Sequence, residues 1–253
     1  MKRVLITGAT SAIAAAMARL LARENEGAQL YLLGGRSREK LDRLVAELEQ
    51  IRSGTVVEAR TADFDETGAN EAAVNAAIAA LGGLDLAVIA QGLLGDQIAT
   101  EASYAEAEQV LTTNLLGVVS ILIPLGNHFE RAGGGHIAVF SSVAAERGRP
   151  RNYTYAAAKG ALNVYLQGLR SRLYPRGTKI HVLKVGPVHT PMTATHEKNR
   201  LFVSPEVAAR DVLRAIAANK FEAYVPWFWR PIMSIVRNLP EPLFQRARSL
   251  SGR

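Results

Sequence analysis

Ser142, Tyr155 and Lys159 have the residue types and the spacing of an acid–base site. If a helix begins after the turn at residues 148–150, Tyr155 and Lys159 lie four positions apart on one face, so the ammonium can reach the phenol. An unperturbed tyrosine titrates near pH ~10, and a nearby cation favours its phenolate. The pattern therefore predicts a tyrosine that transfers protons close to neutrality. The alternative is an ordinary amphipathic helix with a tyrosine–lysine pair on its surface.

Alternating apolar and amphipathic stretches must hold these residues in place. Short apolar runs, typical of buried strands, occupy residues 4–6, 30–33, 56–57, 86–89, 137–140 and 180–185. Apolar residues recur at helical spacing over residues 13–21, 41–51, 70–80, 105–127 and 155–173. A further helix is predicted to begin at Pro205, with Ser204 as its N-cap. Repeated strand–helix units with continuous apolar strands predict an α/β fold, a doubly wound parallel sheet between two helical layers.

The composition of the 253-residue chain suits one large domain and excludes several kinds of site. With 48% hydrophobic residues, the chain can bury a sizeable core. It has no cysteine, which excludes disulfides, thiolate chemistry and thiolate zinc sites. Its five histidines lack ligand spacing, so no metal site is predicted. The lack of cysteine also fits a reducing cytoplasm, which is the location we expect.

The C-terminal segment, residues 226–253, concentrates positive charge and aromatic residues. Its five arginines against a single acid account for most of the net charge of +7, so we expect no nucleic-acid partner. Both tryptophans, Trp227 and Trp229, lie here and are followed by aliphatic residues. Such a segment suits a membrane-surface helix, which Pro240 and Pro242 would interrupt. It equally suits a tail that packs on the sheet or on a partner subunit.

The turn after the first strand reads Thr7-Gly8-Ala9-Thr10-Ser11-Ala12-Ile13-Ala14. With the serine, tyrosine and lysine above, it resembles the Thr-Gly-x-x-x-Gly-x-Gly turn of the short-chain dehydrogenase/reductase family, and the resemblance extends from Val4 to about Tyr224. The resemblance implies a Rossmann-type catalytic domain over residues 1–225 that binds a nicotinamide dinucleotide. Two family glycines are alanines here: Ala14 suits helix–strand packing, and Ala12 adds a methyl where the phosphates come closest. The cofactor-binding residues implied in this turn are Gly8, Thr10, Ser11 and Ile13.

The end of the second strand indicates which nicotinamide cofactor is bound. An acidic residue there would bind the ribose 2′-hydroxyl of NAD(H), whereas this chain reads Gly34-Gly35-Arg36-Ser37-Arg38. Arg36, helped by Ser37 or Arg38, suits the 2′-phosphate of NADP(H) through charge-assisted hydrogen bonds. NADP(H) is therefore predicted over NAD(H). The alternative is that these basic residues only form the solvated start of the next helix.

Further family positions follow the later strands. Ile89-Ala90-Gln91-Gly92 stands where the family has Asn-Asn-Ala-Gly, so only Gly92 and backbone contacts carry over. The other positions that the resemblance assigns to the site are Asp63 and Phe64 at the adenine, Ala90 after the fourth strand, Asn114 at a proton-relay water, and Val188 and Thr190 at the nicotinamide. An alternative role for Asp63 is to cap a helix or stabilise a turn.

The resemblance also implies a mechanism. Ser142 and Tyr155 hydrogen-bond the substrate carbonyl, and Tyr155 supplies the proton while hydride arrives from the nicotinamide. Lys159 is expected to lower the phenol pKa and to contact the nicotinamide ribose, as Tyr155 does. In reverse, the same residues would oxidise a secondary alcohol.

Two short segments bear on the substrate. Residues 92–97 and 224–227 resemble a subgroup of decaprenylphosphoryl-2-keto-pentose reductases, which implies a lipid-linked keto sugar and contact of residues 226–253 with the inner face of the membrane. One alternative is a 3-oxoacyl carrier-protein reductase, whose acidic partner the basic surface would dock. Another is a catalytically weak NADP-binding sensor or scaffold, suggested by the alanines at glycine positions. We expect a homo-oligomer, either a dimer or a tetramer.

Overall fold

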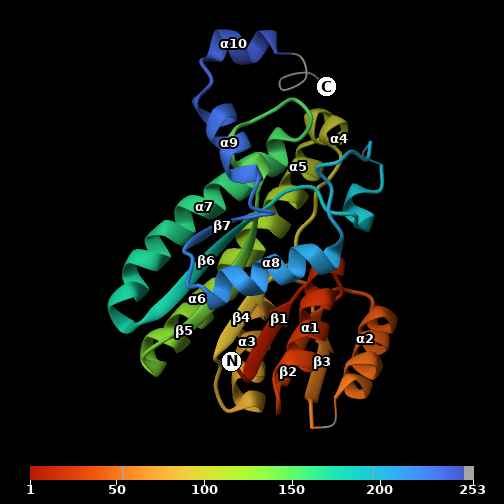
Figure 1. Ribbon diagram of the computed structural model, residues 1–253, viewed down its shortest axis with the longest axis vertical. Coiled ribbons are helices and arrows are strands. Elements are labelled where there is room, and N and C mark those ends of the chain that lie inside the picture. The colour runs from red at the N-terminus through yellow and green to blue at the C-terminus, as the bar shows by residue number, and fades with distance from the viewer. Residues whose placement is uncertain (53, 196, 248–253) are drawn as a thin grey trace.

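The computed structural model describes residues 1–52, 54–195 and 197–247. In this part of the chain, seven parallel strands form one sheet in the order β3-β2-β1-β4-β5-β6-β7 (Figure 1). The chain reverses its direction of winding between β1 and β4, which is the place where doubly wound sheets bind ligands. The strands are β1 Arg3–Thr7, β2 Gln29–Gly34, β3 Val56–Thr61, β4 Leu86–Ile89, β5 Gly135–Ser142, β6 Thr178–Val185 and β7 Glu222–Val225.

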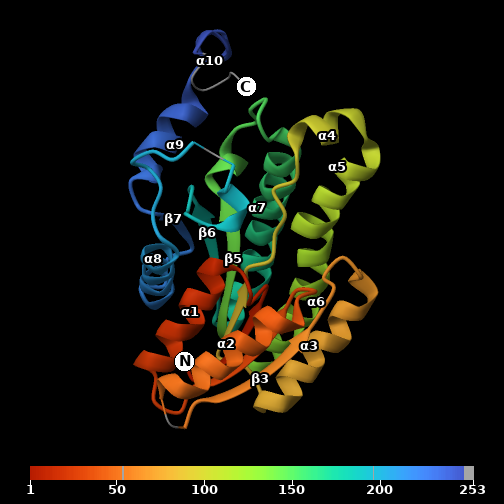
Figure 2. The same ribbon diagram turned by 90° about the vertical axis from the view of Figure 1, so that its right-hand side faces the viewer.

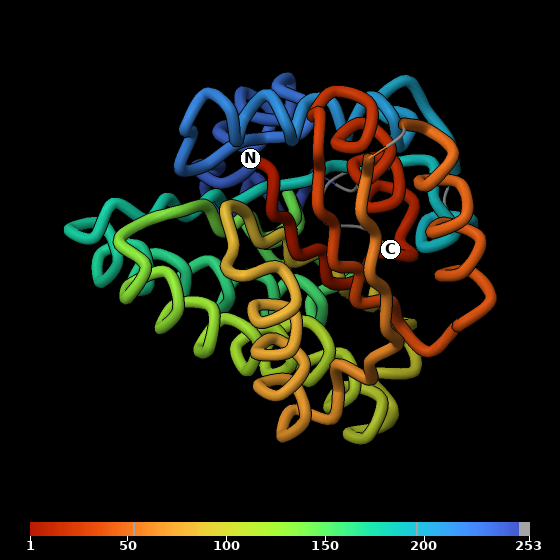
Figure 3. The backbone as a smooth tube through the Cα atoms, turned by 90° about the horizontal axis from the view of Figure 1, so that it is seen from below, coloured from red at the N-terminus to blue at the C-terminus, as the bar shows by residue number. Residues whose placement is uncertain are grey.

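Two layers of helices cover the sheet (Figure 3). The helices on one face are α1 Ala12–Glu24, α2 Arg38–Ile51 and α8 Pro205–Ala217, and those on the other are α3 Thr67–Leu81, α6 Gly117–Ala132 and α7 Tyr153–Leu173. Side chains alternate along the strands, so Val4 and Ile6 join the core under the first group and Leu5 joins the core under the second. The predicted Rossmann-type, three-layer α/β fold is confirmed.

Local signals in the sequence set several element ends. Ser204 caps α8 by accepting a hydrogen bond from the Val207 amide at 3.3 Å, as its place before Pro205 predicts. Gly82 ends α3 in the left-handed conformation with φ 62°. Short 3₁₀ turns occupy Val143–Glu146, Tyr174–Arg176 and Pro191–Thr193. The apolar pattern does not predict β7, because this strand has four residues and only two are buried.

A long helical run lies within the second layer. It consists of α4 Gln97–Ala102, α5 Tyr104–Leu111, a π-helical turn Thr112–Leu116, and α6. By length and composition alone, Tyr104–Ala132 could cross a membrane, with a mean hydropathy of 1.6, but half of its most apolar window is buried. Leu122, Leu125 and Phe129 pack in the core under the sheet. In this structure the run is a core helix.

The tail packs on the domain beyond the carboxyl ends of the strands (Figure 2). It forms α9 Trp229–Asn238 and α10 Glu241–Arg246, separated at Pro240. Trp229, Met233 and Phe244 are buried in one cluster, so the apolar face of α9 is used inside the molecule.

Arg147 makes several contacts that fix this tail to the rest of the domain. Arg147 donates hydrogen bonds to the carbonyls of Val236 at 2.8 Å and Leu239 at 2.5 Å, and it forms an ion pair with Glu241. Its guanidinium also lies 3.8 Å from the centroid of the Phe244 ring. Both tail helices are therefore held by a residue close to the catalytic serine in the sequence.

Candidate active site

The carboxyl ends of the strands bring together residues that are far apart in the sequence. Gly8 follows β1, Gly92 follows β4, Ser142 ends β5 and Val188 follows β6. Since these four strands are neighbours in a parallel sheet, the four positions share one edge. This is the edge at which a substrate and a dinucleotide would meet.

Ser142 and Tyr155 meet across the loop between β5 and α7. The Ser142 Oγ accepts a hydrogen bond from the Ala144 amide at 3.1 Å, which begins a 3₁₀ turn and leaves the hydroxyl proton free to donate. Tyr155 lies in the first turn of α7, with its phenol close enough to the Ser142 side chain for that side chain to oppose the rise of the phenol pKa. The two hydroxyls are thus placed to bind one substrate oxygen together.

Lys159 lies one helical turn beyond Tyr155. Its Nζ is 5.9 Å from the centroid of the Tyr155 ring, and it donates a hydrogen bond to the Phe140 carbonyl of β5 at 3.0 Å. The lysine is 2% exposed, so the pair is not a solvated surface feature. The spacing seen in the sequence places the ammonium beside the phenol.

Burial sets the pKa values of this pair. It raises the pKa of Tyr155 to about 12, against the opposing effect of the Ser142 side chain. It lowers the pKa of Lys159 to about 8. The expected lowering of the phenol pKa by Lys159 is not met, because loss of water around the phenol dominates and the opposing effect comes from Ser142. At neutral pH Tyr155 is a protonated acid beside a cationic lysine.

Asn114 joins the site from the π-helical turn, a feature that the sequence pattern does not reveal. Its buried Nδ2 donates to the carbonyls of Leu93 at 2.6 Å and Val110 at 2.8 Å, and its Oδ1 accepts from the Leu93 amide at 3.2 Å. A Cβ on Gly92 would lie 3.0 Å from that Oδ1 and 3.7 Å from the Lys159 Nζ. Only a glycine between them lets the amide and the ammonium approach, and π turns often mark functional sites.

The turn after β1 has the backbone that a bound pyrophosphate requires. Gly8 has φ +66°, and a Cβ there would lie 2.5 Å from the Gln91 amide nitrogen. Ser11 caps α1 by accepting from the Ala14 amide at 3.3 Å, and the first turn of α1, described in full, contains no acid. The positive end of the helix is therefore open to an anion. Ala14 is fully buried, as its packing role predicts, and α1 begins at Ala12, so the residues present fit a dinucleotide.

Gln91 is a further residue of this edge that sequence reasoning missed. It is 7% exposed, and its Oε1 accepts a hydrogen bond from the Thr7 hydroxyl at 2.5 Å. This bond ties the end of β1 to the loop after β4. The departure from the family sequence at this position was the available signal, since a buried glutamine needs a specific partner.

Arg36 and Asp63, expected to bind different parts of the cofactor, pair with each other. The Arg36 guanidinium is exposed and donates to both Asp63 oxygens, at 2.8 and 3.1 Å, and to Asp65 at 3.3 Å. The same contact holds the pKa of Asp63 below its usual value. Asp65 in turn accepts from the Thr113 hydroxyl at 2.7 Å, next to Asn114. The arrangement links the end of β2 to the π-helical turn.

The other expected cofactor contacts divide into three groups: helix or turn caps, buried side chains and partly buried positions. Ser37 caps α2 by accepting from the Lys40 amide at 3.4 Å, and Thr190 caps the turn Pro191–Thr193. The side chains of Phe64 and Val188 are buried, so they offer a cofactor only their backbone. The partly buried positions at this edge are Thr10, Ile13, Ala90 and Gly92.

Comparison with known proteins agrees with this geometry. A family model described as short chain dehydrogenase matches residues 2–201. The chain therefore belongs to the short-chain dehydrogenase/reductase family of oxidoreductases, as the sequence motifs predict.

Its relatives include proteins of actinobacteria. An uncharacterized oxidoreductase of Mycobacterium tuberculosis is 32% identical over 245 residues, covering 96% of each chain. Another, of Streptomyces coelicolor, is 33% identical over 97% of this chain and 95% of its own. The short-chain reductase protein NovJ of Streptomyces niveus is 34% identical over 74% of this chain and 70% of its own. A short-chain dehydrogenase/reductase from Mycobacterium ulcerans shares the fold, with a TM-score of 0.78 at 22% identity over 88% of this chain and 87% of its own.

Proposed function

We propose that this chain is an NADP(H)-dependent oxidoreductase that interconverts a ketone and a secondary alcohol. One observation carries the proposal: Ser142, Tyr155, Lys159 and Asn114 converge at the carboxyl edge of the sheet, beside a turn that fits a pyrophosphate. The name of the relative from Streptomyces niveus, a short-chain reductase, favours the reductive direction.

The residues of the site divide the chemistry among them. When bound, the nicotinamide supplies or accepts a hydride. Ser142 and Tyr155 donate hydrogen bonds to the carbonyl oxygen and stabilise the negative charge that develops on it. Tyr155 donates its proton to that oxygen, which the raised pKa of the phenol permits at neutral pH. The Lys159 ammonium, held by the Phe140 carbonyl, stabilises the phenolate that remains.

A tyrosine variant tests this assignment. Tyr155→Phe should lower kcat by about 10²- to 10⁴-fold because it removes the proton donor, while NADPH binding stays near normal. Tyr165→Phe, on the same helix, is the matched control and should keep activity. The assay follows NADPH and NADP⁺ with a panel of ketones and alcohols that includes keto sugars, polyprenyl-phosphate sugars and acetoacetyl thioesters. Full activity of Tyr155→Phe on this panel would refute the mechanism.

The preference for NADP(H) rests on the end of β2. Arg36 and Ser37 lie there, and no acidic residue of β2 competes for the ribose. The hydrogen bonds from Arg36 to Asp63 and Asp65 use its Nε and Nη2, which leaves Nη1 for a 2′-phosphate beside Asp63. Arg36→Glu should raise the KM for NADPH by about 10- to 100-fold and change the KM for NADH little. Arg43→Glu, exposed on α2, is the control; equal KM changes for both cofactors in Arg36→Glu would remove the preference.

We further infer peripheral contact of the tail with an anionic membrane at the inner face of the cell. The buried face of α9 is not available for this contact, but Trp227, Ile235 and Leu243 are 75%, 67% and 52% exposed, in a segment rich in arginine. In flotation with anionic vesicles, the wild type should be recovered with the vesicles. Less of the double variant Trp227→Ser and Ile235→Ser should be recovered with them. Val164→Ser, an exposed apolar position on α7, is the control. Equal recovery of all three proteins would refute the contact.

A further inference from the structure

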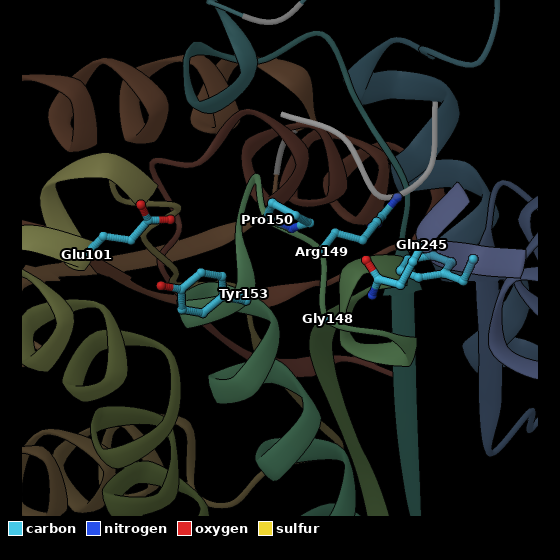
Figure 4. A pocket seen from close by; sticks show the side chains of 7 residues that line it. Glu101, Gly148, Arg149, Pro150, Tyr153 and Gln245 are labelled. Carbon is cyan, nitrogen blue, oxygen red and sulfur yellow. The ribbon is translucent and has the colours of Figure 1, made fainter. Parts of the chain in front are cut away.

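A pocket of about 450 Å³ lies beside the catalytic loop (Figure 4). Its walls come from three segments: the end of α4, the loop at residues 148–150 with the start of α7, and α10. The loop leaves the turn that Ser142 begins and enters the helix that carries Tyr155. The loop that lines the pocket therefore connects Ser142 to Tyr155.

Arg149 lines this pocket without a partner. Its side chain is partly buried, and among the described residues it makes no hydrogen bond or ion pair. Burial, together with the neighbouring Arg151, lowers the pKa of Arg149. Arg147, two positions earlier, shows the contrast, because it satisfies its guanidinium with two carbonyls and Glu241.

A partly buried cation without an anion is costly. Glu101 also lines the pocket, but it is exposed, lies across the pocket from Arg149 with Pro150 between them in Figure 4, and has no part in the pKa shift of Arg149. It does not neutralise the arginine. Tyr153 and Phe244 add aromatic surface to the walls. The pocket thus combines an unneutralised cation with an apolar lining.

We propose that Arg149 binds an anionic group of the substrate, a phosphate or a carboxylate, while the ketone lies at Ser142 and Tyr155. A guanidinium binds either anion through two parallel charge-assisted hydrogen bonds. Arg149 then determines which ketones bind and takes no part in proton transfer. This inference rests on the proposed ketone reduction.

Matched ketones test the substrate class. The wild type should prefer dihydroxyacetone phosphate over dihydroxyacetone, or 4-oxopentanoate over its methyl ester. The pair in which the anionic ketone is preferred shows whether the bound group is a phosphate or a carboxylate. Arg149→Gln should lower kcat/KM for the anionic ketone by about 30-fold or more, mainly through KM, and leave the neutral ketone within about threefold. Arg149→Lys should restore part of the loss, and Arg151→Gln, which does not line the pocket, should change both ketones alike. An unchanged anionic-to-neutral ratio in Arg149→Gln would refute the proposal.

A second measurement does not depend on turnover. Inorganic phosphate, compared with chloride at equal ionic strength, should raise the Tm of an Arg36→Gln protein, which removes the arginine expected at the cofactor phosphate. Adding Arg149→Gln should reduce that rise, and what remains is phosphate bound at the turn after β1. If no ketone is reduced but the phosphate effect depends on Arg149, the proposed function fails and the anion site stands. If the phosphate effect is absent, or is the same with and without Arg149, the anion site fails.

Discussion

Replacing Lys159, which we propose acts in catalysis, should stabilise the fold while it removes activity. Lys159 is 2% exposed, and burial lowers its pKa from 10.5 to about 8. Lys159→Met keeps the aliphatic chain and its volume but removes the ammonium. The variant therefore separates the packing of this side chain from the cost of burying its charge.

The size of the effect follows from the pKa change. A fall from 10.5 to about 8, at about 1.4 kcal/mol per unit, means that the proton costs about 3 kcal/mol in the folded state at pH 7. The lost hydrogen bond from the Lys159 Nζ to the Phe140 carbonyl is worth about 1 kcal/mol. The net gain is about 2 kcal/mol, or a Tm rise of about 4–8 °C for a chain of this length.

The pH dependence gives the effect a signature. Because the unfolded lysine keeps its proton to a pKa of 10.5 and the folded one loses it at about 8, the cost to the wild type is full below pH 8 and disappears as the pH rises toward 10.5. Urea unfolding between pH 6.5 and about 9.5, below the ordinary titration of tyrosine, should show the two stabilities converge. Lys40→Met, exposed on α2, should change stability by less than about 0.5 kcal/mol. A Lys159→Met protein that is less stable at pH 7, or a gap that does not depend on pH, would refute the reasoning.

Three further outcomes are expected. The rate of ketone reduction should fall as the pH rises through about 8, where Lys159 loses its proton. A rate that does not change up to pH 10 would contradict the role of the Lys159 ammonium in the reaction. Gly8→Ala should destabilise the fold by about 2 kcal/mol or more in urea unfolding and weaken NADPH binding, because the new Cβ would collide with the backbone of Gln91. Gly27→Ala is the control: it has a similar φ of +68° in open space, so it measures the cost of the backbone conformation alone. Trp229→Ala should cost about 3 kcal/mol because the ring is buried against Gly186, whereas Trp227→Ala, 75% exposed, should leave the Tm unchanged.

The alternation of apolar and amphipathic stretches was enough to predict the layers and most strand positions. Helical spacing predicted that Lys159 would lie beside Tyr155, because positions four apart share a helix face, and the family resemblance placed Ser142 at the same site. β7 escaped prediction because four residues, of which two are buried, carry little periodic signal. The π-helical turn at Asn114 escaped because it differs from an α-helix only in hydrogen bonding, not in composition.

Side-chain partners were the least predictable part of the site. Arg36 and Asp63 each suit a cofactor group, yet they suit each other as well, and only the structure shows that they pair. The pKa of Tyr155 depends on how completely water is excluded, which spacing along a helix does not reveal. The tail was ambiguous for the same reason, since the apolar face of α9 fits a membrane or its own domain equally well.

The contacts of Arg147 with α9 and α10 have a consequence for how substrate specificity diverges among relatives. They attach α10, near the end of the chain, to the pocket that lies beside the catalytic loop. Substitutions after Pro240 would therefore reshape this pocket, where we propose that the anionic group of the ketone binds, without touching Ser142 or Tyr155. The chain end would act as an exchangeable part of the enzyme, and exchanging α10 between homologues should transfer substrate preference while the reaction stays the same.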